Sequence, residues 1–141
     1  MVIVYNMNIG QCPGNPPPRN AGDKEREVAG GPQYPKAEVL ALLADIRVRP
    51  WTKDCAIDIA KLELDISEVA VLAAEAVSHG RFQGSVWCTQ SPDGPSAICD
   101  AYVLKRKEWN NAAKKELDCE YYVKLAIGRS GAVLLLVSCH T

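Results

Sequence analysis

The sequence predicts an α+β domain in which N-terminal helices pack on a mostly antiparallel β-sheet. Three observations predict it. Apolar residues recur with a helical period between residues 35 and 80, patterns typical of strands follow from residue 81, and the chain ends in a strongly apolar run. The chain has 141 residues, of which 48% are hydrophobic and 23% charged. These values are ordinary for one soluble globular domain with a sizeable core.

The last stretch, 119–141, predicts a β-hairpin. Two runs rich in β-forming residues are joined by the four residues Gly-Arg-Ser-Gly at 128–131. The second run is apolar at consecutive positions over 132–137, which is typical of a strand buried on both faces. It is therefore expected to lie inside the sheet, with strands beside it and helices covering it.

The first run of this hairpin alternates, so its side chains separate into two faces. Tyr122 and Lys124 fall on one face, opposite an apolar set on the other. His140 ends the second run at a position whose parity it shares with Leu134 and Leu136. If the register of the two strands allows it, Tyr122, Lys124 and His140 meet at one rim of the sheet.

Residues 1–34 are not expected to belong to the core. The stretch from Gly10 to Asp23 is rich in Pro, Gly and Asn and keeps neither a helical nor a strand period. We expect a flexible tail, with a segment that becomes ordered on a partner as the alternative. The folded domain is expected to span 35–141.

Three helices are expected in the first half of the domain. Pro35 opens the first one from a favoured position, and its apolar stripe is Val39, Leu42, Leu43 and Ile46. An extended piece at 47–49 precedes Pro50, and a second helix covers about 52–61. The third begins with a capping box of Asp65 and Glu68, and His79-Gly80 ends it with a residue able to carry a positive charge and a C′ glycine. His79 is interpreted as a helix-end residue rather than a ligand.

The second half is expected to supply the strands. One runs over 81–88 and another over 97–106, with a turn cluster at 91–95 between them. The polar connection 105–118 is expected to hold a helical turn at about 109–117. The hairpin described above completes the sheet.

Composition excludes several classes of protein. The net charge is −1, but residues 35–80 carry −3 and residues 81–141 carry +2, so the strand-rich half is mildly basic. The longest apolar run is too short to cross a membrane, and the first residues lack the features of a signal peptide, so a cytoplasmic protein without a membrane partner is expected. Six cysteines without a Cys-x-x-Cys pair, and two histidines without zinc-ligand spacing, predict neither a metal site nor a cofactor.

Four short motifs, in this order, resemble the MqsR family. They are Phe-x-x-Ser (Phe82, Ser85), Asp-x-Tyr (Asp100, Tyr102), Tyr-x-Lys-Leu (Tyr122, Lys124, Leu125) and a terminal Leu-Leu-Val-Ser run. The resemblance covers about 35–141. It implies a bacterial, cytoplasmic type II toxin with a RelE-like fold. Such a toxin is an mRNA interferase, a metal-independent endoribonuclease that cuts single-stranded mRNA through attack of the 2′-hydroxyl. A cognate antitoxin, bound in a hetero-oligomer, is implied as its inhibitor.

The resemblance also assigns candidate residues. The catalytic tyrosine of the family falls on Tyr122 and its C-terminal catalytic lysine on His140, whose imidazole exchanges protons near neutral pH. The lysine of the family on the Phe-x-x-Ser strand falls on Gly84, and its glutamine falls on Cys99. Arg81, Lys105 and Lys124 are the candidates for the missing positive charge, and stabilisation of the phosphorane is assigned to Arg81 and Lys124.

RNA binding is assigned to four residues near the connection: Lys105, Arg106, Lys107 and Tyr102. For Asp100 and Tyr102 the preferred interpretation is an architectural role, in which they orient the loop and take no part in the chemistry. The alternative for the basic connection is an ordinary solvated loop. Three other readings of the chain stay open. These are a diverged member that binds RNA or a protein without cutting, a zinc-stabilised adaptor, and a Cys99–His140 thiol site.

Overall fold

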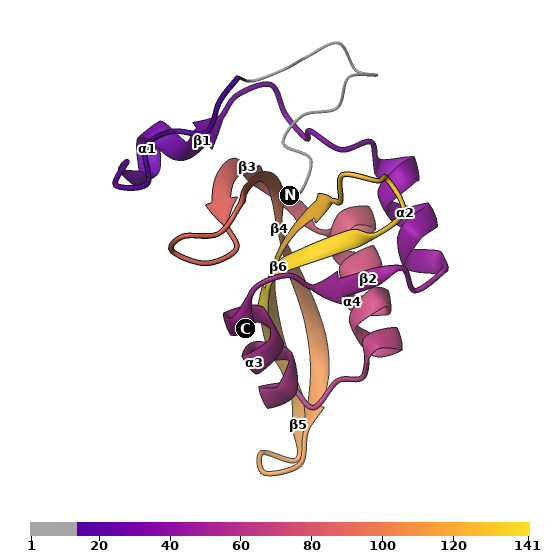
Figure 1. The fold of residues 1–141 in the computed structure, drawn as a ribbon. Coiled ribbons are helices and arrows are strands. Elements are labelled where there is room, and N and C mark those ends of the chain that lie inside the picture. The colour runs from indigo at the N-terminus through magenta and orange to yellow at the C-terminus, as the bar shows by residue number, and fades with distance from the viewer. Residues whose placement is uncertain (1–13) are drawn as a thin grey trace.

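A computed structural model describes residues 14–141 and confirms the α+β class. Within these residues it has four helices and a six-stranded sheet (Figure 1). The elements are α1 (Asp23–Arg26), β1 (Glu27–Val28), α2 (Lys36–Ala44), β2 (Val48–Pro50), α3 (Lys53–Lys61), α4 (Ile66–His79), β3 (Arg81–Thr89), β4 (Ser96–Asn110), β5 (Lys115–Ile127) and β6 (Leu134–His140).

The strands lie in the order β1-β3-β4-β5-β6-β2, and all neighbours are antiparallel except β2 and β6, which are parallel. Helices α2 and α4 pack against each other on one face of the sheet (Figure 1). Helix α3 follows directly on β2 and packs along β6. We call the face turned away from α2 and α4 the open face.

The three expected helices form, and side-chain caps define the starts of α3 and α4. The Asp65 carboxylate accepts a hydrogen bond from the backbone N–H of Glu68 at 2.9 Å, and the Glu68 carboxylate accepts one from the N–H of Asp65 at 3.1 Å. The Thr52 hydroxyl accepts a hydrogen bond from the N–H of Cys55 and so caps α3. Ile46 was wrongly included in the stripe of α2. The helix ends at Ala44, and the Ile46 side chain is 45% exposed.

Gly80 ends α4 in extended conformation (φ −79°, ψ −179°), so the left-handed form typical of a C′ glycine is not used here. Its requirement for glycine is one of space. A Cβ at this position would lie 2.4 Å from the carbonyl oxygen of Ala76 and 2.7 Å from that of Val103. The missing side chain therefore lets the end of α4 approach β4 closely.

Replacing Gly80 by alanine is expected to lower the free energy of unfolding by about 1–3 kcal/mol, the usual cost of forcing an extra carbon into a packed site. Urea denaturation measures it. Gly22→Ala is the matched control, because a Cβ there meets nothing within 4 Å. Gly22 is the N-cap of α1, so this change should cost about 0.5 kcal/mol, the difference between glycine and alanine at such a position. Equal stability of the two variants would contradict the steric explanation.

The C-terminal hairpin is confirmed. Strand β6 lies between β5 and β2, and its three leucines, Leu134, Leu135 and Leu136, are almost completely buried. A strand inside the sheet is covered from both sides, which accounts for apolar residues at consecutive positions.

The prediction that His140 shares a face of the strand with Leu134 and Leu136 is wrong, because β6 contains a β-bulge. Leu136 pairs with Leu125, but the next pair along the ladder is Ser138 with Lys124, so Val137 is an extra residue. The bulge moves every later side chain to the other face. His140 therefore lies opposite Tyr122, on the open face, while Leu134 and Leu136 point into the core.

The connection 105–118 contains no helical turn. β4 and β5 continue through it as a long hairpin, whose tight end is the segment 111–114 (Figure 1). Its charges are cross-strand pairs. The Nζ atom of Lys105 lies 3.7 Å from Oε2 of Glu120, and the Nζ atom of Lys107 lies 3.5 Å from Oδ1 of Asp118. Opposite charges on directly paired residues stabilise a ladder that has few apolar contacts.

The segment before residue 35 contributes more than a tail. β1 pairs with β3, Tyr34 is 3% exposed and belongs to the core, and the buried Asp100 carboxylate accepts hydrogen bonds from the backbone N–H groups of Gln33 and Tyr34. The domain boundary expected at 34/35 thus falls within a packed segment. The remainder of the expected tail, residues 1–13, lies outside the described residues. No helix in the described part of the chain is long and apolar enough to cross a bilayer.

Candidate functional site

The four candidate catalytic residues all project from the open face. Arg81 pairs with Val103, Val103 with Tyr122, and Tyr122 with His140, so one cross-strand row joins four strands. Directly paired residues point to the same side of a sheet. Lys124 lies two residues from Tyr122, in the neighbouring row with Ala101 and Ser138.

The rings of Tyr122 and His140 are in contact. Their centroids are 5.5 Å apart and their planes 24° apart, a stacked arrangement. Tyr122 is 42% exposed and His140 is exposed, so both rings are accessible to a ligand. The sequence predicted that these two side chains meet, and the bulge in β6 is what brings them together.

Glu120 belongs to this site, and the sequence analysis missed it. Its carboxylate accepts a hydrogen bond from the Tyr122 hydroxyl at 2.6 Å and forms an ion pair with Lys105. That hydrogen bond, with Lys105 and Arg81, lowers the pKa of Glu120. The signal was present, because Glu120, Tyr122 and Lys124 follow each other at every second position and so share one face.

The same hydrogen bond and the charge of Glu120 raise the pKa of Tyr122 above its ordinary value of 10.0. An ionised Tyr122 would place two negative charges side by side, which is unfavourable. The phenol therefore remains protonated throughout the neutral range, and it is suited to donate a proton.

In Glu120→Gln the pKa of Tyr122 is expected to fall toward 10, because the replacement removes the negative charge that opposes the phenolate. Ultraviolet absorbance during an alkaline titration measures phenolate formation. Subtracting the titration curve of the same protein with Tyr122→Phe leaves the contribution of Tyr122 alone. An unchanged Tyr122 titration in Glu120→Gln would show that the carboxylate does not control it.

Lys124 lies at the centre of the open face and is half-buried. Its side chain lines a cavity of about 260 Å³ next to Tyr122 and His140, and also a larger cavity of about 750 Å³ on its other side. Among residues 14–141 no hydrogen bond or ion pair engages its ammonium group. An uncompensated cation between two cavities is suited to bind an anion.

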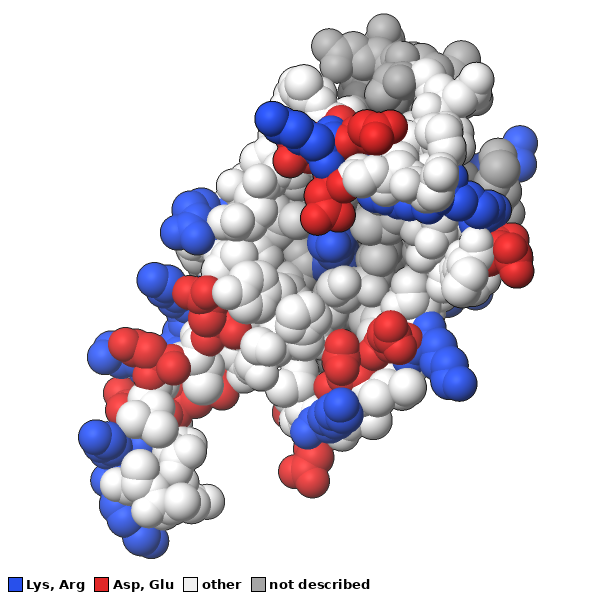
Figure 2. Space-filling view, turned by 90° about the vertical axis from the view of Figure 1, so that its left-hand side faces the viewer, with Lys and Arg blue, Asp and Glu red and all other residues white. Residues whose placement is uncertain are grey.

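The charges on this side of the molecule are mixed. Figure 2 shows a face that is hollowed near its centre, with a basic side chain in the hollow and groups of both signs around it. Arg81 is exposed at one end of the row described above. Its guanidinium donates two hydrogen bonds, at 2.9 and 3.0 Å, to the Gln83 amide oxygen when that amide is oriented to receive them.

The candidate RNA-binding residues are not brought together. Lys105 and Lys107 project from the same face as Tyr122, each beside an acidic partner. Arg106 points to the other face, where it forms ion pairs with Glu75 and Glu108. Tyr102 is 7% exposed and packs against Phe82 in the core, so its side chain is not available to RNA.

Asp100 makes the contacts expected of an architectural residue, the interpretation preferred from the sequence. It is completely buried, accepts a hydrogen bond from the Ser85 hydroxyl at 2.6 Å, and holds the backbone of Gln33 and Tyr34. Burial raises the pKa of its carboxyl group, and these hydrogen bonds oppose that change. Asp100 thereby positions the segment before α2.

Cys99 does not suit a thiol nucleophile. Its side chain is completely buried, and burial, with the neighbouring Cys88, raises the pKa of the thiol well above its ordinary value. The Cys99–His140 alternative therefore lacks an accessible thiolate.

Within the described residues, no three His, Cys, Asp or Glu side chains are grouped closely enough to hold a metal ion. What the site offers is a phenol, an imidazole, a carboxylate and two cations on one open face. Comparisons of the chain with protein-family models, with curated proteins and with solved structures found no match.

Proposed function

We propose that this chain is an endoribonuclease of the MqsR type, the toxin of a bacterial type II toxin–antitoxin system with a RelE-like fold. The single observation that carries the proposal is the row of Arg81, Tyr122 and His140 with Lys124 beside it. The catalytic tyrosine and lysine of the family fall on Tyr122 and His140. Arg81 and Lys124 replace the positive charge that is missing at Gly84. The substrate is single-stranded mRNA, and a cognate antitoxin in the cytoplasm is the partner.

The chemistry requires a base, an acid and positive charge. The His140 imidazole takes the proton from the 2′-hydroxyl as that oxygen attacks the adjacent phosphate. Tyr122, kept protonated by Glu120, donates its proton to the leaving 5′-oxygen. Lys124 and Arg81 stabilise the negative charge of the phosphorane. The products are a 2′,3′-cyclic phosphate and a 5′-hydroxyl.

In this proposal Lys124 takes the place of the family lysine that Gly84 lacks. Gly84 pairs with Ala101, and Ala101 pairs with Lys124, so Lys124 lies in the same cross-strand row as Gly84. The long side chain of Lys124 can extend from β5 over the short residues Ala101 and Gly84 and place its ammonium group there. The positive charge is thus supplied from another strand.

The experiment is to incubate the purified chain with mRNA, with and without a chelator, and to map the ends of the fragments. We expect cleavage at unchanged rate in the chelator, with 5′-hydroxyl and cyclic phosphate ends. Fragments with 5′-phosphate ends, or cleavage abolished by the chelator, would contradict the proposed chemistry.

The second candidate is a diverged protein that keeps this face for binding only. The observation that favours it is Cys99, a buried thiol at the position of a polar family residue. RNA that binds, is protected from other nucleases and remains uncut under all conditions would support this candidate over the first.

A further inference from the structure

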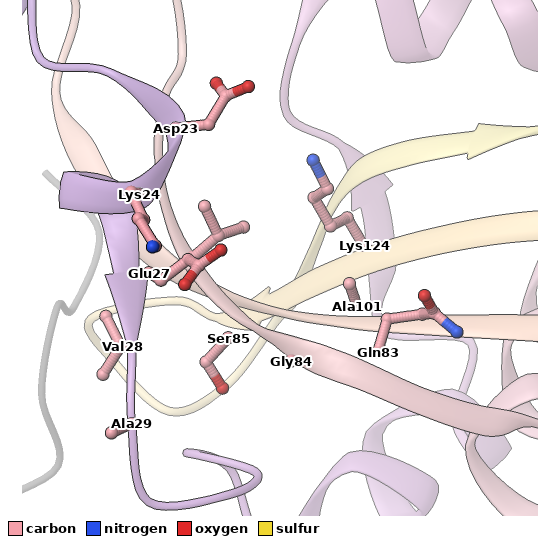
Figure 3. A pocket seen from close by; sticks show the side chains of 11 residues that line it. Asp23, Lys24, Glu27, Val28, Ala29, Gln83, Gly84, Ser85, Ala101 and Lys124 are labelled. Carbon is pink, nitrogen blue, oxygen red and sulfur yellow. The ribbon is translucent and has the colours of Figure 1, made fainter.

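Two cysteines lie next to each other on the open face, on neighbouring strands. Cys88 of β3 pairs with Ala97 of β4. Cys99 follows two residues after Ala97, so both thiols project to the same side of the sheet from diagonal positions of the ladder. Lys124 and Ala101, which pair with each other on β5 and β4, also point to this side (Figure 3).

Only one of the two thiols faces a cavity. Cys88 is half-buried and lines a space of about 580 Å³ between the start of α3, the end of β3 and the end of β6. Lys53 reaches this space from α3, and Ser138 reaches it from β6. Cys99 is completely buried. A small molecule that enters the cavity can therefore meet Cys88 but not Cys99.

The surroundings of Cys88 favour its thiolate. Hydrogen bonding with Cys99 and the positive charges of Lys124 and Arg26 lower the pKa of Cys88 to about 7, although burial opposes this change. Burial is the main cause of a raised pKa in the other four cysteines of the described segment 14–141, which are Cys55, Cys99, Cys119 and Cys139. The thiolate is the nucleophilic form, and about half of Cys88 is in this form at neutral pH.

We propose that Cys88 and Cys99 form a peroxide-sensitive dithiol, in which Cys88 is oxidised first and Cys99 then closes a disulfide with it. An accessible thiol with high thiolate content beside a second, resolving thiol is the arrangement found in redox-sensing cysteines. The inference is independent of the proposed function, because it requires no RNA and no antitoxin.

The oxidation takes place in two steps. The Cys88 sulfur attacks one oxygen of hydrogen peroxide, the O–O bond breaks, and hydroxide leaves and takes up the proton that Cys88 released. The Cys99 sulfur then attacks the sulfur of the Cys88 sulfenic acid, the S–O bond breaks, and hydroxide leaves as water with the proton of the Cys99 thiol. The two thiols together lose two electrons, and the peroxide gains them.

The disulfide requires a small movement at the end of the ladder. Diagonal neighbours have Cα atoms about 7–8 Å apart, whereas a disulfide usually spans about 4.4–6.8 Å. Cys88 is the second-last residue of β3, and the exposed segment 90–93 follows the strand, so this end of β3 is the part free to move toward β4. Strain makes a disulfide easier to reduce, and the modification is therefore expected to be reversible.

Treatment of the full, reduced chain with hydrogen peroxide tests the proposal. The remaining thiols are alkylated, and peptide mapping by mass spectrometry identifies the products. We expect a Cys88–Cys99 disulfide as the first product, reopened by reduced glutathione. A disulfide between any other pair, or a Cys88 sulfenic acid that never proceeds to a disulfide, would overturn the proposal.

Two variants separate the steps. In Cys99→Ala, Cys88 should stop at the sulfenic acid, which dimedone traps. Cys119→Ala is the matched control, because Cys119 is also half-buried but has a raised pKa, and it should still form the Cys88–Cys99 disulfide. Loss of the disulfide in Cys119→Ala would show that the assigned pair is wrong.

Rates of alkylation by iodoacetamide in the unchanged, reduced chain give a second measurement that needs no substitution. At pH 7 Cys88 should react at least about fivefold faster than Cys119, because its larger thiolate fraction outweighs the lower nucleophilicity of a thiolate of low pKa. The Cys88 rate should level off once the pH exceeds its pKa of about 7, while the Cys119 rate continues to rise. Equal rates for the two thiols would contradict the proposed activation of Cys88.

Discussion

Replacing His140 by alanine is expected to lower the rate of RNA cleavage by a factor of about 10²–10⁴, the usual contribution of general acid–base catalysis. The other group of the site able to accept a proton, the Glu120 carboxylate, is already engaged by the Tyr122 hydroxyl and by Lys105, so it does not replace the imidazole. His140 is exposed at the end of β6, and its loss leaves the core intact. The measurement is single-turnover cleavage of a short RNA.

His79→Ala is the matched control, since His79 is the other histidine of the chain and lies exposed at the end of α4. Its cleavage rate should equal that of the unchanged protein. Unfolding curves of both variants show whether stability has changed. If His140→Ala cuts at the original rate, the imidazole takes no part in proton transfer, and the proposed mechanism is wrong.

Replacing Asp100 by alanine is expected to lower the free energy of unfolding by roughly 3–5 kcal/mol, because each buried donor that loses its acceptor costs about 1–3 kcal/mol. The change leaves the N–H groups of Gln33 and Tyr34 without their acceptor, and the Ser85 hydroxyl keeps only the Gly31 carbonyl oxygen, at 3.2 Å. Each buried donor without a partner is costly. Chemical denaturation measures the loss.

Ser85→Ala removes one of these donors together with its hydrogen bond to Asp100, and it should lower the free energy of unfolding by about 1 kcal/mol. Asp93→Ala, in the exposed turn between β3 and β4, is the control and should stay within about 0.5 kcal/mol of the unchanged protein. A loss for Asp100→Ala no greater than that for Asp93→Ala would show that the segment before α2 is held by other contacts.

The sequence was sufficient for elements with strong local signals. The capping box at Asp65 and Glu68, the proline before α2 and the consecutive apolar residues of β6 each determine structure within a few neighbouring residues. These signals predicted the helices, the hairpin and the α+β class. They also predicted that Tyr122 and Lys124 share a face.

The sequence predictions were wrong where contacts with residues distant in the sequence determine the structure. The charges of 105–118 are typical of a loop, and only their partners across the hairpin, such as Glu120 for Lys105, make them a ladder. Tyr34 follows a Pro/Gly-rich stretch, yet Asp100 and the core hold it. The bulge at Val137 leaves no local pattern, because leucine and valine fit either face.

That bulge has a consequence for how relatives of this chain are to be aligned. Val137 is the surplus residue of β6, and its carbonyl oxygen accepts a hydrogen bond from the Thr52 hydroxyl at the start of α3. A homologue with a regular last strand would have one residue fewer here. An alignment without a gap would then place the last histidine of that homologue opposite Cys139 instead of His140. The histidine would be counted as missing although it is present in both chains.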